Sequence, residues 1–239
     1  MKKIILLFCL LTAVTASYAS EQVYFKIAVN ENDYSTFLTD RISTKQKILQ
    51  YLATKMRQPF FKPEQLNRKY YKVVESRGIK YFDVNVVQYD VRPIHNDRFR
   101  HLLMVDQRNG VVIRKEIYDT QGKLVFAFTS LEKHSQEPLP RAQKISKKPA
   151  EEVFKGYFLV HDKTLKDGTR HMSFTDGLNK FSVFRKKYDI ELNTMERILY
   201  GNYVFRKSVG KELFTVVGTL PFTEMERLVE NISNLEENK

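Results

Sequence analysis

The sequence predicts an α+β protein of two domains, each built on an antiparallel sheet. Apolar and polar residues alternate in short runs separated by Gly-containing turns, first over residues 70–131 and again over residues 157–218. Residues 132–150 lie between these regions, are polar, carry three prolines and have no apolar period, which is typical of a linker. Apolar residues at helical spacing over 223–235 predict a final helix that packs on the second, smaller sheet.

Residues 1–19 have the organisation of a secretory signal peptide. Lys2 and Lys3 precede an apolar run from Ile4 to Val14, and small residues follow it. Such a run is too short to span a bilayer as a stable helix. We therefore expect an exported protein that does not span the membrane. The only cysteine, Cys9, would leave with the signal, which excludes disulfides, thiol chemistry and Cys-ligated zinc in the mature chain.

The composition is basic, with 40 Lys and Arg against 28 Asp and Glu and a formal net charge of +12. A positive surplus favours anionic partners such as lipid head groups, lipopolysaccharide or an acidic protein segment. Export makes nucleic acid the least favoured of these partners. The alternative is a well-solvated surface without a partner, since the basic residues are spread along the chain.

The first domain is expected at residues 20–131 and opens with a strand at residues 23–29, followed by a polar, turn-rich segment at 30–40. Thr44 is placed to cap a helix that runs to about Arg57. Its apolar stripe indicates a core-facing helix more often than one lying on a membrane.

A β-meander follows. Its first two strands, at 71–75 and 81–91, are expected to join through Arg77-Gly78, and Gly-ended turns at 106–110 and 119–122 connect three later strands.

The second domain, residues 151–239, is expected to contain two hairpins. Asp176-Gly177 suits a two-residue turn with positive φ, which would place Thr175 opposite Leu178. Gly210-Lys211 closes a second hairpin, with Val209 opposite Glu212. Alternation gives each hairpin one apolar face. The two faces contain Met172, Phe174, Phe181 and Val183 in the first hairpin, and Tyr203, Phe205, Phe214 and Val216 in the second.

Two helices are expected in this domain. Residues 189–199 carry apolar side chains at spacings that fit a helix. At the end of the chain, Thr223 and Glu226 form the pattern of a capping box, which predicts that the closing helix begins there.

Three segments carry a resemblance to a known family. SFTDGLNKFSVF at 173–184 and FTVVGTLPFTEMERLV at 214–229 are similar to motifs of the C-terminal domain of the RseB/MucB family. RHLLMVDQRNGVVIRKEIYDTQGKLVFAF at 100–128 resembles the end of that family's N-terminal domain, a half-barrel of the LolA type. About 110 residues separate the signal from the linker, so the resemblance implies a shortened LolA-like sheet with its helix.

The resemblance implies a periplasmic regulator of envelope-stress (sigma-E) signalling. Its partner would be the periplasmic segment of a membrane-bound anti-sigma factor, shielded from proteolysis while bound and released by a lipid or lipoprotein signal. The alternatives are a LolA-like carrier of lipid or lipoprotein without a signalling partner, and a structural envelope protein.

Two sets of candidate binding residues follow from these patterns. A lipid cavity would be lined by apolar meander and first-strand residues, which by default form plain core: Phe25, Ile27, Val84, Val86, Leu103 and Val105. A protein partner would meet basic residues on the two hairpins, with Lys180 close to Arg206: Lys180, Arg185, Arg206 and Lys207. The alternative for the second set is ordinary strand-edge lysines and arginines that guard against aggregation.

The sequence offers no catalytic pattern. The five histidines form no metal-binding spacing, and there is no nucleophile elbow, phosphate-binding loop or dinucleotide glycine motif. We therefore expect no catalysis, no cofactor and no metal.

Overall fold

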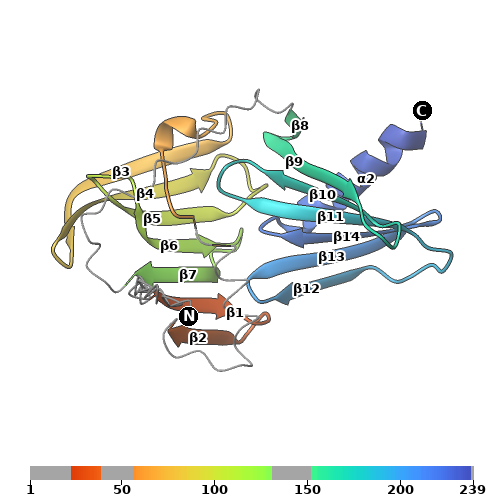
Figure 1. Cartoon of the computed structure of the whole chain (residues 1–239), viewed down its shortest axis with the longest axis horizontal. Coiled ribbons are helices and arrows are strands. Elements are labelled where there is room, and N and C mark those ends of the chain that lie inside the picture. Colours follow the sequence, from red (N-terminus) through yellow and green to blue (C-terminus); the bar gives the residue numbers. More distant parts are fainter. Residues whose placement is uncertain (1–22, 39–55, 57, 131–151, 238–239) are drawn as a thin grey trace, which may run out of the picture.

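The computed structural model describes residues 23–38, 56, 58–130 and 152–237. They form two seven-stranded antiparallel sheets that lie side by side, with a helix packed on the second (Figure 1). This arrangement confirms the α+β fold class. In the described part of the chain, no helix has the length and apolar character needed to cross a membrane. The signal peptide, the linker and nearly all of the helix expected at 44–57 lie outside the described residues.

The first sheet is a meander closed by the N-terminal hairpin. Its strands are β1 (Val23–Ala28), β2 (Tyr34–Leu38), β3 (Tyr71–Tyr81), β4 (Val84–Pro93), β5 (Arg100–Asp106), β6 (Val112–Tyr118) and β7 (Leu124–Ser130), in the order β2-β1-β7-β6-β5-β4-β3. A single 3-10 turn, η3 (Pro63–Gln65), precedes β3. The turns predicted at 106–110 and 119–122 are confirmed, because they connect β5 to β6 and β6 to β7.

Two local predictions for this sheet are wrong. The turn between β3 and β4 lies at Phe82-Asp83 rather than at Arg77-Gly78, which instead forms a bulge where the register of β3 shifts. Gly78 has φ +75°, so its backbone suits a bulge as well as a turn. Part of the segment expected to be turns is strand β2, which pairs with β1 across the turn at 29–33.

One face of the first sheet forms most of its core. The register aligns Phe25 with Phe128, Phe128 with Lys115, and Lys115 with Leu103, so these side chains share a face. His101 lies two residues from Leu103 on the same side of β5. A lysine and a histidine are therefore buried among aromatic and aliphatic side chains.

The second sheet has one face on the helix and one face away from it. Its strands are β8 (Glu152–Phe154), β9 (Tyr157–Thr164), β10 (Arg170–Thr175), β11 (Lys180–Lys187), β12 (Met195–Leu199), β13 (Asn202–Val209) and β14 (Glu212–Gly218), in the order β12-β13-β14-β11-β10-β9-β8. The helix is α2 (Phe222–Glu237). Met225, Leu228 and Val229 of α2 are buried, and the predicted apolar faces of both hairpins are buried as well. Each such side chain contributes roughly 1.5–3 kcal/mol by leaving water.

The second hairpin has its predicted register, with Val209 opposite Glu212. The first does not, because its loop contains four residues rather than two and Thr175 lies opposite Lys180. The Asp176 carboxylate accepts hydrogen bonds from the backbone N–H groups of Leu178 and Asn179, at 3.0 and 2.7 Å, which stabilises the wider loop. A shift of two residues leaves every side chain on its predicted face.

The helix predictions need two corrections. Residues 195–199 form strand β12, paired with β13, rather than a helix over 189–199. Pairing with a neighbouring strand overrides a weak helical pattern here. Helix α2 begins at Phe222, and the carbonyl of Pro221 accepts its first hydrogen bonds. Thr223 therefore lies inside the first turn rather than at the cap.

Candidate binding site between the two sheets

The four-residue loop between β10 and β11 inserts a buried polar cluster between the sheets. Tyr71 donates a hydrogen bond of 2.5 Å to Asp176 Oδ2, and Arg98 Nη1 donates to the same oxygen at 3.1 Å. Asn179 Nδ2 donates to Tyr71 Oη at 2.8 Å, which leaves Asn179 Oδ1 to accept from His101 Nε2 at 3.0 Å. The loop of the second sheet thus contacts three side chains that belong to the part of the chain forming the first sheet.

Arg98 is the centre of this interface. The residue is 1% exposed, and its guanidinium pairs with Asp97 at 3.0 Å and donates to the carbonyl of Lys155 at 2.7 Å. Its carbon Cζ also lies 4.3 Å from the centre of the Tyr70 ring. Burial raises the pKa of Tyr71, and the Asp176 carboxylate raises it further, so Tyr71 stays a hydrogen-bond donor at every physiological pH.

More contacts join the sheets at a second point. Tyr203 donates a 2.7 Å hydrogen bond to Asp119 and stacks edge-on against Phe99. The backbone N–H of Gly201 donates to the carbonyl of Ala28 at 2.7 Å. A polar, proline-containing linker favours few contacts between the halves that it connects, but these two sheets contact each other directly. Linker composition describes only the connecting chain, whereas these contacts come from the ends of the strands.

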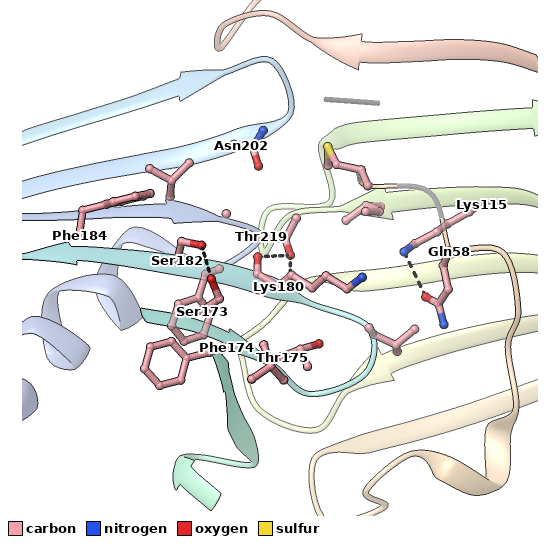
Figure 2. A pocket seen from close by; sticks show the side chains of 17 residues that line it. Gln58, Lys115, Ser173, Phe174, Thr175, Lys180, Ser182, Phe184, Asn202 and Thr219 are labelled. Carbon is pink, nitrogen blue, oxygen red and sulfur yellow. Dashed lines mark hydrogen bonds between the residues drawn. The ribbon is translucent and has the colours of Figure 1, made fainter. Parts of the chain in front are cut away.

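A pocket of about 570 Å³ lies between the sheets. Figure 2 shows Lys115 and Lys180 extending toward each other from opposite sides of it. Met56 and Ile117 of the first domain and Leu178 and Phe181 of the second supply apolar wall. The size and the mixture of apolar walls with a few polar groups are typical of a binding pocket.

Lys115 is the unusual group in this pocket. Its side chain is 2% exposed, and its one hydrogen bond within the described residues is to Gln58 Oε1 at 3.3 Å. Burial and, to a smaller extent, Lys180 lower the pKa of Lys115, whereas Asp176 opposes the shift, and together they place the pKa at about 7. Burial also lowers the pKa of His101, as does Lys115, so His101 is neutral.

Polar groups of the second sheet continue the pocket along the face that points away from α2. Ser173 and Ser182 hydrogen-bond each other at 3.0 Å, and Thr219 accepts a hydrogen bond from the backbone N–H of Lys180 at 3.0 Å. Phe184 lies flat against His171 with ring centres 4.5 Å apart. Beside the pocket, this face therefore presents hydroxyl groups, the Phe184 ring and the exposed Lys180 ammonium.

The predicted partner residues divide between the two faces of the second sheet. Lys180 and Arg206 lie on the face away from α2, whereas Arg185 pairs with Glu212 at 2.7 Å and Lys207 pairs with α2. Arg206 of β13 lies opposite Thr215 of β14, and Thr215 lies opposite Phe184 of β11. Phe184 is four residues along β11 from Lys180. The expected proximity of Lys180 and Arg206 is wrong, since a separation of four residues is about 13 Å along a strand.

The lipid-cavity candidates do not converge on this pocket. Phe25, Ile27, Leu103 and Val105 lie in the core of the first sheet and are at most 4% exposed. Val86 is paired with Asp106 and so faces the opposite side of the sheet from Val105, while Val84 is partly exposed. None of the six lines the pocket. Their role in holding an acyl chain stays a prediction.

Sequence reasoning missed Lys115, Gln58 and the Asp176 cluster. The sequence did contain a signal for Lys115. Its side chain lies on the same side of β6 as that of Ile117, because the two residues are two positions apart in the strand. The described residues include no group of three or more His, Cys, Asp or Glu side chains able to hold a metal ion.

The described residues thus form an α+β structure of two antiparallel sheets with a pocket between them. Its fold is that of MucB. The structure of the Pseudomonas aeruginosa MucA/MucB complex matches with a TM-score of 0.58 at 16% identity, covering 87% of this chain and 89% of that one. MucB in complex with MucA(peri) matches with a TM-score of 0.59 and MucB alone with 0.54, both at 16% identity over 87% of this chain and 89% and 88% of theirs. No protein-family model and no curated protein matches the sequence.

Proposed function

We propose that this protein is a periplasmic regulator that binds the periplasmic segment of a membrane-bound anti-sigma factor and thereby modulates envelope-stress signalling. The observation that carries the proposal is the match to MucB over both sheets, including MucB in complex with MucA. The protein acts by binding and not by catalysis.

The site supports this role physically. A pocket with apolar walls and two ammonium groups suits a polypeptide segment that carries both apolar and acidic side chains. The exposed Lys180 and the chain's formal charge of +12 would attract such a segment before contact. We expect association to be faster at low ionic strength for the same reason.

Binding of the full mature chain to the periplasmic segment of a single-span anti-sigma factor from the same organism tests the proposal. We expect calorimetry to show a complex that weakens with salt, and a Lys180→Glu, Arg206→Glu variant to bind roughly tenfold more weakly. Lys72→Glu is the matched control, because Lys72 is an exposed lysine on β3. No binding at any salt concentration would rule out the function, and equal binding by the double variant would remove Lys180 and Arg206 from the interface.

The carrier alternative has one observation in its favour, the apolar wall of the pocket. A carrier would retain acyl ligands through purification. Native mass spectrometry of the purified protein is expected to show the bare chain mass. A reproducible lipid adduct, displaced by a fluorescent acyl probe, would favour the carrier instead.

A further inference from the structure

Lys115 has a buried ammonium and no carboxylate to neutralise it within the described residues. Its neighbour across the pocket is another cation, Lys180, and its hydrogen-bond acceptor is the amide of Gln58. The nearest acidic group that acts on it, Asp176, is already engaged by Tyr71 and Arg98. Burying an ammonium group among apolar side chains without a charged partner costs several kcal/mol. An anion bound beside Lys115 would offset this cost.

We propose that the pocket recognises a carboxylate of the bound protein segment, an Asp or Glu side chain flanked by apolar residues, and that Lys115 is the residue that selects it. The inference rests on the proposed function and specifies the chemistry of its partner. Lys180, exposed at the same pocket, would guide the carboxylate inward, and Gln58 would hold the Lys115 ammonium in position.

The lining favours a peptide over a lipid as the source of this carboxylate. Ser173, Thr175, Ser182, Asn202 and Thr219 distribute hydroxyl and amide groups along the pocket, where backbone N–H and C=O groups of a peptide find partners. An acyl chain offers these groups no further hydrogen bond, so they would keep only their partners within the protein, such as the Ser173–Ser182 bond at 3.0 Å, and would lose their contact with water. The apolar wall of Leu178 and Phe181 then receives the flanking side chains.

Recognition of this kind couples binding to proton uptake. With a pKa of about 7, Lys115 is largely neutral at pH 8 in the free protein, and an adjacent carboxylate raises its pKa. Affinity is then highest below pH 7 and falls as the pH rises above 7, until the pKa of the complex is passed. The other groups facing Lys115 do not supply this effect: Asp176 is held by Arg98, His101 is neutral, and Lys180 carries the same sign of charge.

A double-mutant cycle tests the proposal on the full mature chain. The probe is the periplasmic segment of a single-span anti-sigma factor from the same organism, with each Asp and Glu replaced in turn by Asn or Gln. We expect one replacement to weaken binding roughly 30-fold or more to the wild type, and less than about threefold to Lys115→Met. Lys115→Met preserves the side-chain length and removes a buried charge, so it is expected to fold at least as stably as the wild type. Lys72→Met serves as the matched control.

Calorimetry at pH 8 in phosphate and in Tris gives the second readout. The wild type is expected to take up close to one proton on binding, and Lys115→Met close to none. The proposal is overturned if no single carboxylate couples to Lys115, or if proton uptake persists in Lys115→Met. It is also overturned if dodecanoate binds in a Lys115-dependent manner while the segment shows no coupling, since the occupant is then an acyl chain. Absence of any segment binding to the wild type instead rules out the proposed function itself.

Discussion

Replacing Asp176 by alanine is expected to lower the free energy of unfolding by about 3–5 kcal/mol, because it leaves the buried Arg98 guanidinium without one of its two carboxylate partners. Arg98 has a fully buried side chain, and Asp176 is 3% exposed at its side chain, so water cannot replace the lost interaction. The same substitution removes the acceptor for Tyr71 and for two backbone N–H groups of the loop. Urea denaturation followed by circular dichroism measures the loss.

The matched control is Asp162→Ala. Asp162 also pairs with an arginine, Arg170, at 2.8 Å, but the two side chains are 33% and 40% exposed. An exposed pair of this kind contributes at most about 1 kcal/mol. Since Asp176 joins the two sheets, we also expect its loss to separate unfolding into two transitions. A loss for Asp176→Ala no larger than that for Asp162→Ala would show that the cluster does not hold the sheets together.

Replacing Gly218 by alanine is expected to cost about 3 kcal/mol or more. A Cβ at this position would lie 2.3 Å from the backbone oxygen of Lys180 and 2.5 Å from Cα of Phe181. Both atoms belong to the backbone of a paired central strand, so neither can move away without breaking the ladder. The φ of +152° adds strain for any residue with a side chain. Thermal unfolding and soluble yield both report the effect.

Gly168→Ala separates steric clash from backbone strain. Gly168 also has a positive φ, +82°, but a Cβ added there meets nothing within 4 Å. Its substitution should therefore cost only about 1–2 kcal/mol, the penalty for an L-residue in this region. Equal losses for both glycines would mean that the close approach at Gly218 is relieved by small backbone shifts.

Local patterns determined much of this fold. Period-two alternation placed Phe174, Phe181, Phe205 and Phe214 on buried faces, because successive side chains of a strand point to opposite sides whatever the sheet contains. Gly-ended turns located most hairpins, since positive φ is a property of single residues. Helical spacing identified the buried face of α2, although the start of the helix was predicted one residue too late.

Tertiary structure alone decided the register of the first hairpin, the strand at 195–199 and the site between the sheets. Asp176 and Asn179 widen their loop while contacting residues that are 78 to 108 positions away in sequence. Lys115 faces Lys180 only because the ends of two separate sheets meet. Turn propensity and alternation describe neighbours along one chain segment, whereas the burial of these polar groups depends on which surfaces come together. Which surfaces pair is set by the free energy of the whole packed molecule and cannot be predicted from any single segment.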